Sequence, residues 1–582
     1  MHKSLIGFLA LMFILEVGMP LHAQGSPDNN IAMLVQKMSL EEKVGQLLMA
    51  RVLEGPDGMP SDETERLIKE CYVGSVIFYS TSDPEFTARY TNQLQKWAAQ
   101  TRLGIPLLVG ADFEFGPRMI VANGVTGFPQ EMGIGATGDP QMAGLAAKIT
   151  AQEARSMGVQ WVFAPVADIN TNPQNPVIGV RSFGSDPEAV SQMVVAAVKA
   201  YKDNNVIGTV KHFPGHGDTS LDSHYSLPTV SYGWNELEKH LQPFKAAIAA
   251  GVDSIMTAHI IVKAIDPHHP ATLSKAILTN LLRKKLGFKG LIITDAMNMK
   301  AISDHFGTGE AAVMALQAGA DVVMSAGSYW DLIAMETAIL QAVEDGKIAE
   351  SRINESVKRV LELKSRYGLF KDDARYVNPD KANDLCGTQE HLRAALDMAQ
   401  RSITLLKNDN KWLPLSSNLK KILVVGVRDT VYAVADEIQR RFPNIQVETY
   451  RAAHARLSDN WTPSLSNIAM ATDMAKEADT IIALTYSSQE ISDGQVQLVQ
   501  KLSNLGKPLI VIAQGLPYDI TKFPSISTYL VNYAYNRWQA PSPTHNTVTK
   551  ATVGMLFGEF KPTGKLPVEI PGLFPVGYGI SY

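Results

Sequence analysis

The chain has 582 residues, too many for one ordinary hydrophobic core, because single cores stop growing at about 250–300 residues and longer chains divide into domains. Hydrophobic residues make up 45% and charged residues 19%, which is typical of a folded globular protein and excludes a largely disordered chain. The formal net charge of −5 provides no surplus of Lys and Arg to neutralise phosphates, so nucleic acid is not an expected partner.

Residues 1–23 have the pattern of a secretory signal peptide. Met1-His-Lys3 provides a charged start and precedes the apolar run Leu5–Leu15. The segment Leu21-His-Ala23 then ends in a small residue, and cleavage is expected after Ala23. An N-terminal membrane anchor is the alternative, but the apolar run is short for a span of ~20 residues. We therefore expect an exported protein, periplasmic or extracellular, without stable membrane insertion after cleavage.

Apolar runs then recur along the chain, with helical segments between them. Helical periodicity covers Ile31–Met49, and amphipathic helices are predicted at Pro187–Asn204 and Trp234–Ala250. The apolar runs are typical of parallel strands buried on both faces: Val73–Tyr79, Pro106–Phe113, Val159–Ile169, Val206–Lys211, Ser254–Ile260, Gly290–Ala296 and Asp321–Ser325, with Val44–Arg51 as an eighth candidate. This alternation predicts an α/β fold, a (β/α)8 TIM-like barrel over residues 28–370.

The most informative segment follows the strand predicted at Val206–Lys211. It reads Lys211-His-Phe-Pro-Gly-His-Gly-Asp-Thr219, and Asp222-Ser-His224 comes just after it. Its Gly and Pro residues exclude a helix, so His212 and His216 cannot form the same-face pair of a helical zinc motif. No metal or other cofactor is expected. A polar loop remains, at the end of a strand where barrels keep their active sites.

Asp222 and His224 have the residue types of a proton-transfer pair. An imidazole titrates near ~6.5, so it can both give and take a proton around neutral pH. A carboxylate on one ring nitrogen fixes the tautomer and stabilises the cation. Taken alone, an Asp-x-His on a loop is more often a surface hydrogen bond, so the pair needs support from elsewhere.

Asp295 provides that support. It ends the apolar strand predicted at Gly290–Ala296, which would deliver it to the catalytic rim of a barrel. A carboxylate there is suited to attack an anomeric carbon and to stabilise oxocarbenium charge. The alternative is a helix N-cap at the turn after the strand.

Asp112, Arg181, Lys211 and His212 follow or end predicted strands and are candidates to hold a sugar. Carboxylates accept from pairs of hydroxyls, whereas Arg, Lys and His donate. Each residue taken singly is as well explained by a structural ion pair.

A second α/β pattern follows a polar stretch. Residues 371–398 are predicted to be an interdomain linker, and residues 399–582 a second domain, an α/β three-layer sandwich. Its predicted strands are Lys421–Val427, Gln446–Tyr450, Thr480–Tyr486, Pro508–Ala513 and Ile526–Asn532, with helices at Val431–Arg441 and Gly494–Leu505. Cys71 and Cys386 lie far apart in the sequence and are interpreted as buried small hydrophobes.

Assembled, these segments resemble the family-3 glycoside hydrolases, and within them the β-N-acetylglucosaminidase branch. The match covers nearly the whole chain after the signal. It includes Met38–Gln46, the loop Lys211–Thr219 with Asp222-Ser-His224, Ile293-Thr-Asp295-Ala-Met, and the second-domain segments Arg401–Asn408, Leu413–Leu415 and Gly558–Pro567.

The resemblance implies an exo-acting retaining glycosidase that removes terminal non-reducing β-N-acetylglucosamine. Asp295 would form the glycosyl-enzyme, and the Asp222–His224 dyad would be the acid/base. The implied partner is a small carbohydrate, an N-acetylglucosamine-terminated oligosaccharide or a muropeptide from peptidoglycan turnover. Phosphate is an alternative to water as the second nucleophile, which accepts the sugar from Asp295. The reason is that an imidazole repels an anion less than a carboxylate does.

Two other functions stay open at this stage. In the family's β-glucosidase branch the acid/base carboxylate lies on the second domain, where Glu490 is a conceivable counterpart. A catalytically silent sugar-binding protein would keep the barrel as a receptor.

The chain also departs from the family pattern after Glu114, because Ile120 occupies the register of a sugar-binding arginine. Arg118 is the predicted substitute in the sugar pocket.

Overall fold

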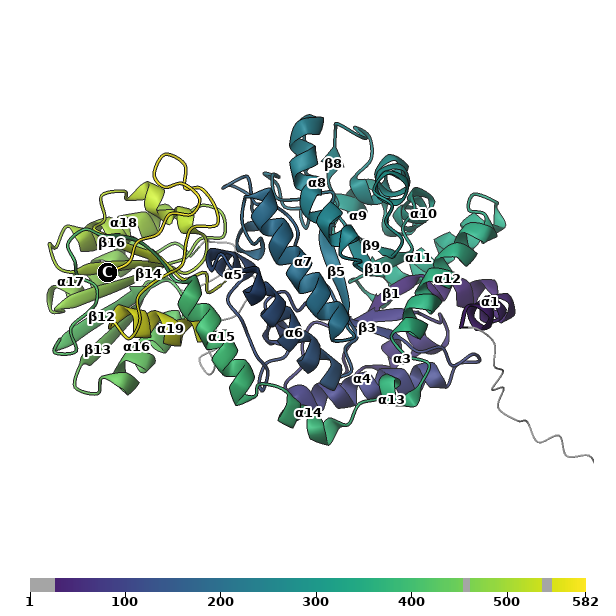
Figure 1. Ribbon diagram of the computed structural model, residues 1–582, viewed down its shortest axis with the longest axis horizontal. Helices are drawn as coiled ribbons and strands as arrows, with labels where there is room; N and C mark the ends of the chain where they lie inside the picture. The colour runs from purple at the N-terminus through teal and green to yellow at the C-terminus, as the bar shows by residue number, and fades with distance from the viewer. Residues whose placement is uncertain (1–26, 454–460, 536–546) are drawn as a thin grey trace, which may run out of the picture.

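The protein is described by a computed structural model that covers residues 27–453, 461–535 and 547–582. The predicted signal peptide and its cleavage site lie outside the described residues. The described chain forms two units that lie side by side, a barrel and a smaller sheet domain (Figure 1). None of the described helices combines the length and the apolar character needed to cross a membrane.

The first unit is a closed barrel of eight parallel strands, as predicted. Their order around the barrel is β1-β10-β9-β7-β5-β4-β3-β2. The strands are β1 Leu48–Arg51, β2 Ser75–Ile77, β3 Leu108–Ala111, β4 Trp161–Val162, β5 Ile207–Phe213, β7 Ser254–Thr257, β9 Leu291–Ala296 and β10 Val322–Ser325. A two-stranded ribbon of β6 (Thr229–Val230) and β8 (Ile261–Val262) lies outside the barrel sheet.

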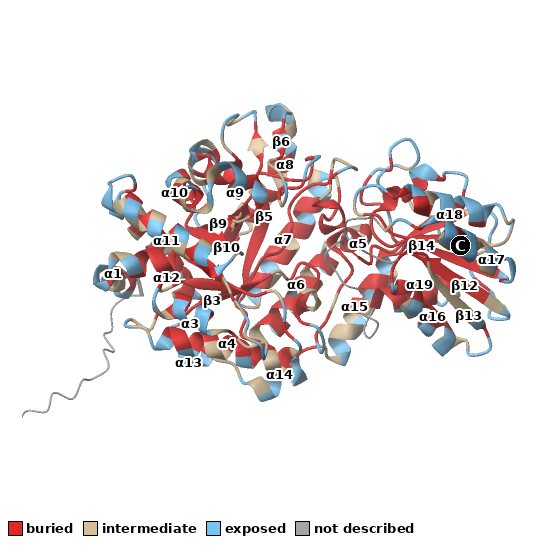
Figure 2. Cartoon of the chain, turned by 180° about the vertical axis from the view of Figure 1, so that it is seen from behind, coloured by how far each residue is buried: buried red, intermediate tan, exposed pale blue. Residues whose placement is uncertain are grey.

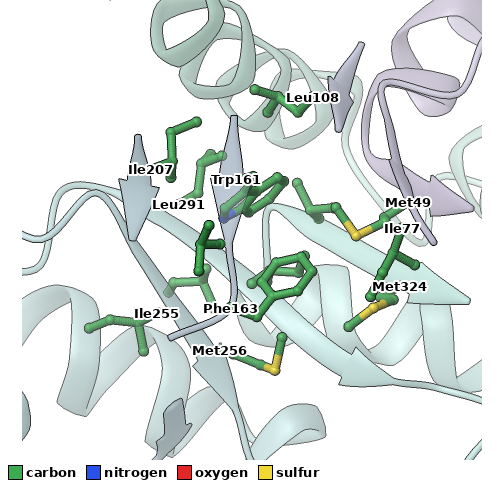
Figure 3. Close-up of a cluster of buried hydrophobic side chains, with 14 of the residues drawn as sticks. Met49, Ile77, Leu108, Trp161, Phe163, Ile207, Ile255, Met256, Leu291 and Met324 are labelled. Carbon is green, nitrogen blue, oxygen red and sulfur yellow. The ribbon is translucent and has the colours of Figure 1, made fainter. Parts of the chain in front are cut away.

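Apolar side chains from different strands fill the barrel (Figure 3). Trp161 and Phe163 are fully buried there, with their ring centroids 5.4 Å apart. The Trp161 indole N–H donates to Thr209 Oγ1 at 2.6 Å, so its polar atom is satisfied in the core. Burial on both faces explains why these strands appear in the sequence as continuous apolar runs.

Helices surround the barrel and bury their inner faces against it, while their outer faces are exposed (Figure 2). Three of them, α4, α6 and α7, begin with Asp-Pro: the side chains of Asp83, Asp139 and Asp186 accept the backbone N–H groups that each helix start leaves without a partner. The helices of this unit are α1 Pro27–Lys37, α2 Leu40–Gln46, α3 Asp62–Lys69, α4 Pro84–Ala99, α5 Glu131–Ala136, α6 Pro140–Ser156, α7 Pro187–Asp203, α8 Trp234–Ala249, a π-helix Ala276–Lys285, α9 Lys300–Phe306, α10 Thr308–Ala318, α11 Tyr329–Glu344 and α12 Glu350–Arg366.

Two predicted elements of the barrel differ in extent. The periodicity assigned to one helix over Ile31–Met49 belongs to α1 and α2, and strand β1 has already begun at Leu48. The apolar run Val159–Ile169 forms only the two-residue strand β4. Its remainder is buried loop backbone, which explains why the run stays apolar after the pairing ends.

The second unit is an open six-stranded sheet in the order β11-β16-β15-β14-β12-β13, parallel except for the β11–β16 pair. One hydrophobic cluster contains Leu423 and Val425, and another contains Ile422 and Val424, so alternate residues of β12 face opposite layers. The elements are β11 Thr404–Asn408, β12 Lys421–Gly426, α16 Thr430–Arg441, β13 Gln446–Arg451, α17 Leu465–Lys476, β14 Thr480–Thr485, α18 Asp493–Ser503, β15 Leu509–Ala513, β16 Thr528–Val531 and α19 Thr547–Leu556.

Residues 371–398, predicted as a linker, contain helices α13 (Asp372–Arg375), α14 (Pro379–Leu385) and most of α15 (Gln389–Ser402). In α15, His391 Nδ1 lies 2.7 Å from Glu153 Oε1 of α6. The exact domain boundaries stay a prediction. The two units share a core, because Met132, Ala136 and Val180 of the first unit pack into a hydrophobic cluster of the second.

Candidate active site

A cavity of about 430 Å³ opens at the carboxyl ends of the barrel strands. This volume lies within the range of about 300–1,000 Å³ that is typical of small-molecule sites. Its lining is half apolar and half polar, and the polar side chains are those of Asp112, Glu114, Arg181, Lys211, His212, His216, Ser223, His224, Asp295 and Asn298. Among the described residues, the lining comes from the barrel unit alone.

Asp295 is held at the end of β9, behind the fully buried residues Leu291–Thr294. Its Oδ1 accepts the backbone N–H of Ala296 at 2.7 Å. Burial acts to raise the pKa of Asp295. The nearby rings of His259, His212 and His224, with the hydrogen bond from the Ala296 backbone, outweigh burial and lower the pKa to about 2. This carboxyl group is therefore an anion near neutral pH, and its side chain lines the cavity.

His224 and Asp222 form the predicted pair. Nδ1 of His224 lies 2.7 Å from Asp222 Oδ1, and the His224 backbone N–H donates to the same oxygen at 2.9 Å. The Asp222 side chain is only 8% exposed, whereas that of His224 is 37% exposed. Because Nδ1 is engaged with Asp222, Nε2 is the ring nitrogen that can exchange a proton with a ligand. His224 and Asp295 line the same cavity.

The loop that carries the pair is fastened to the helix that follows Asp295. The backbone N–H groups of Lys300 and Ala301, at the start of α9, donate to the carbonyls of His224 and Ser223 at 3.4 and 3.3 Å. Because α9 comes directly after β9 in the chain, these contacts tie the position of His224 to that of Asp295.

His216 supports this loop from the inside. Its Nδ1 lies 2.8 Å from Thr219 Oγ1 and its Nε2 lies 3.0 Å from Ser223 Oγ. Burial, together with the neighbouring His212, lowers the pKa of His216 to about 4, so its ring is neutral near neutral pH. Both ring nitrogens are occupied by hydroxyls, which gives His216 a structural task.

Four charged side chains form a buried cluster beside Asp295. Glu114 accepts from Arg181 Nε and Nη2 at 2.9 and 2.7 Å, and Lys211 Nζ lies 2.7 Å from Glu114 and 2.8 Å from Asp112. Burial acts to raise the pKa of Glu114, but the Arg181 and Lys211 cations hold it far below its usual range. Two cations and two carboxylates thus balance inside the barrel. Asp112 is the most exposed of the four, at 22%.

His212 is oriented by a buried aspartate. Its Nδ1 lies 2.7 Å from Asp168 Oδ2, and the His216 backbone N–H donates to Asp168 Oδ1 at 2.6 Å. Burial acts to raise the pKa of Asp168, but His212 lowers it overall, so Asp168 is an anion. Asp168 thereby fixes the ring of His212 and the start of the loop after β5 together.

Glu114 and Asp168 were not predicted as site residues. The two-residue spacing of Asp112 and Glu114 is the signal that could have found Glu114, since it is the same spacing as in Asp222 and His224. For Asp168 the sequence offers no comparable signal, because its partners come from another strand and its loop.

Arg118, the predicted substitute in the sugar pocket, lies outside the cavity lining. Arg118 lies in a 3₁₀ turn, Pro117–Met119, and its Nη1 donates to the Val121 carbonyl at 3.1 Å. It does not belong to the cavity lining, which includes its neighbours Met119 and Ile120. The sugar-holding role of Arg118 stays a prediction, and the cavity lining does not support it.

Glu490, the candidate on the second domain, forms an exposed ion pair with Lys522. It too is outside the cavity lining.

Cys71 and Cys386 are buried free thiols, as predicted. Within the described part of the chain, His, Cys, Asp and Glu side chains form no group of three that could hold a metal ion.

Comparison with known proteins identifies the class. Residues 39–363 match the glycosyl hydrolase family 3 N-terminal domain, and residues 403–579 match the family 3 C-terminal domain. The chain belongs to glycoside hydrolase family 3, and it is a glycoside hydrolase with the two-domain architecture of that family.

Individual relatives differ in their activities. The chain is 31% identical to beta-hexosaminidase A of Pseudoalteromonas piscicida over 87% of this chain and 91% of the relative. It is 32% identical to beta-glucosidase C of Emericella nidulans over 67% of this chain and 66% of the relative. A family 3 beta-N-acetylglucosaminidase structure from a Paenibacillus species superposes with a TM-score of 0.82 at 34% identity, covering 92% of this chain and 99% of that one.

Proposed function

We propose that the protein is an exo-acting retaining glycosidase that hydrolyses terminal non-reducing β-N-acetylglucosamine. One observation carries the proposal: Asp295 and His224 line one cavity, with Asp222 behind His224 at 2.7 Å from its Nδ1, beside a charged cluster suited to hold a sugar ring. A nucleophile and a proton-transfer group that face a common space are the two components that retaining hydrolysis requires.

The reaction proceeds by double displacement. The Asp295 carboxylate attacks C1 and forms a C–O bond while the glycosidic C–O bond breaks. His224 Nε2, protonated, gives its proton to the departing oxygen. Neutral His224 then takes a proton from water, whose oxygen attacks C1 and releases Asp295. Asp222 stabilises the imidazolium in both steps, as a carboxylate does for histidine in a hydrolase triad.

The charged cluster supplies recognition of the sugar. Asp112 accepts from hydroxyl groups, while Lys211, His212 and Arg181 donate to them. Lys211 and Arg181 are held in place by Glu114, which is itself almost completely buried, so their orientation is set before the sugar binds. A cavity of about 430 Å³ suits a single terminal residue, which supports exo action.

Two observations support N-acetylglucosamine over glucose. The hexosaminidase from Pseudoalteromonas piscicida aligns with most of the chain, and the acid/base candidate lies on the barrel loop. Glu490, the counterpart that a second-domain acid/base would need, is paired with Lys522 away from the cavity.

A panel of 4-nitrophenyl β-glycosides tests the specificity. We expect kcat/KM for the N-acetylglucosaminide to exceed that for the glucoside by at least about 100-fold, equivalent to about 3 kcal/mol of transition-state discrimination. Equal activity on both sugars would overturn the proposal.

The same assay with and without inorganic phosphate distinguishes hydrolysis from phosphorolysis. Free sugar at an unchanged rate supports hydrolysis, and formation of sugar phosphate excludes hydrolysis.

Two variants test the roles. Asp295→Ala is expected to abolish turnover. His224→Ala is expected to spare the first step for substrates with good leaving groups, because such groups need no proton. A silent sugar-binding protein would instead show unchanged ligand affinity and no turnover in the wild type and in both variants.

We further propose that the enzyme is exported and acts in the periplasm or outside the cell. The support is the residue pattern of the first 23 residues. N-acetylglucosamine-terminated oligosaccharides and muropeptides of peptidoglycan turnover are the proposed natural substrates. A fusion of residues 1–30 to a reporter, followed by cell fractionation, tests the export.

A further inference from the structure

Two large hydrophobic side chains flank the acid/base pair in the chain and are more than half exposed. Tyr225, directly after His224, is 61% exposed, and Leu221, directly before Asp222, is 52% exposed. Burying apolar surface is favourable, so exposed aromatic and leucine side chains beside a binding cavity are typical of contact surfaces for ligands.

The segment that bears them has a defined backbone. The carbonyl of Asp222 accepts from the N–H groups of both Tyr225 and Ser226 at 3.0 Å, which closes a turn. The loop is also joined to the start of α9 through Ser223 and His224. This backbone places Tyr225 beside His224, and the centroid of its ring lies 6.4 Å from that of the His224 ring with the two planes tilted by 48°.

The proposed reaction determines which part of a substrate would lie there. A nucleophile displaces the leaving group from the opposite side of C1, and the acid must reach the bridging oxygen. If Asp295 attacks, the bridging oxygen lies at His224, and the sugar or other group beyond that oxygen lies at the residues that adjoin His224. Of the residues that flank the Asp222–His224 pair in the chain, Tyr225 and Leu221 are the exposed ones.

We propose that Tyr225, with Leu221, forms the subsite for the leaving group and selects a second pyranose ring there. The C–H face of a pyranose stacks on an aromatic ring, which removes apolar surface of both partners from water. This inference rests on the proposed function, because it assumes that His224 protonates the bridging oxygen.

The test compares two substrates that share the N-acetylglucosamine ring. One is its β-1,4-linked disaccharide, and the other is its β-fluoride, whose leaving group has no ring to stack. For Tyr225→Ala, we expect the loss in kcat/KM on the disaccharide to exceed the loss on the fluoride by about three- to tenfold, mainly through KM. Tyr225→Phe is expected to keep the wild-type ratio, because it keeps the ring.

The controls separate the possible failures. Tyr432→Ala removes an exposed tyrosine on α16 of the second domain and is expected to leave both substrates unaffected. Equal losses on both substrates for Tyr225→Ala, or no loss on the disaccharide, would overturn the subsite. If the wild type cleaves neither substrate, the proposed function itself fails.

Discussion

At the scale of single residues, Glu114 sets the electrostatics of the site. It pairs with Arg181 and Lys211, and the side chains of Glu114 and Lys211 are each only 2% exposed. Removing one member of a buried ion network leaves a charge without its partner in a low dielectric. The free energy of unfolding then falls by more than the intact network contributes to it.

Glu114→Gln is therefore expected to lower the free energy of unfolding by about 3–5 kcal/mol, measured by urea denaturation. It should also reduce kcat/KM, because Lys211 and Arg181 lose their anchor. The matched control is Glu490→Gln, which breaks an exposed pair and should cost at most about 1 kcal/mol. Similar effects of the two variants would contradict the role given to Glu114.

Residue spacing predicted part of this site. His224 and the strand-terminal Asp295, both singled out from the sequence, line one cavity, because a barrel brings the carboxyl ends of its strands together. Arg118, by contrast, lies outside the cavity lining, in a 3₁₀ turn that follows Gly116 with its φ of 94°. Loop backbone of this kind depends on tertiary contacts that periodicity does not encode.

At the scale of elements, the loop after β4 is hydrogen-bonded to the loop after β5 through one buried side chain. The loop after β4 contains Asn175, which is buried and whose Nδ2 donates to the His216 carbonyl at 2.9 Å. Its Oδ1 accepts the N–H groups of Val177 and Ile178 at 3.0 and 2.7 Å. Asn175 thus connects the cavity wall at Val177 to the loop that carries Asp222 and His224.

Replacing Asn175 by alanine would leave three buried backbone groups without this partner. We expect the free energy of unfolding to fall by about 1–3 kcal/mol and kcat to fall by roughly 10- to 100-fold, with a smaller change in KM. Kinetics and denaturation of the same preparations provide the measurement. Asn418→Ala, at an exposed position of the second domain, is the control. A change in KM alone would argue against a positioning role for Asn175.

The elements themselves were largely predictable. All eight barrel strands and five strands of the second sheet coincide with apolar runs in the sequence. Strand β11 was not predicted, because Thr404–Asn408 is short, lies at the edge of its sheet and ends in polar residues. The helices inside residues 371–398 were also missed, since a polar composition indicates exposure and not the absence of structure.

At the scale of the whole molecule, the second domain is joined to the barrel by more than a connection of the chain. Met132 and Val180 of the barrel unit are buried in the second domain's hydrophobic cluster. Gln489 Nε2 donates to the Gln174 carbonyl at 3.0 Å, and Asn170 Nδ2 lies 3.3 Å from the Tyr518 hydroxyl. The sequence indicated two domains but could not reveal this contact, because apolar periodicity marks a buried face without naming what covers it.

The second domain also gives the molecule a pH-dependent stability. Burial raises the pKa of Asp519 from its usual value of 3.8 to about 6, although Ser487 and Thr485 donate hydrogen bonds to it. The folded state therefore holds this proton more tightly than the unfolded state. Its contribution to stability is present below pH 3.8 and is lost as the pH rises through about 6.

Asp519→Asn removes this titration. Relative to the wild type, the variant is expected to gain about 2–3 kcal/mol at about pH 7.5 and much less at about pH 4.5. Thermal denaturation of both proteins at the two pH values measures the difference. A gain that is the same at both pH values would show that Asp519 does not titrate in this range.

The central claim is that Asp295 attacks the anomeric carbon while His224 serves the leaving oxygen. The most direct measurement uses a 5-fluoro N-acetylglucosaminyl fluoride to trap the glycosyl-enzyme, followed by proteolysis and mass spectrometry of the labelled peptide. We expect the label on Asp295, and we expect it to persist in His224→Ala, because fluoride leaves without a proton. A label on another carboxylate, or steady turnover without any covalent adduct, would contradict the account.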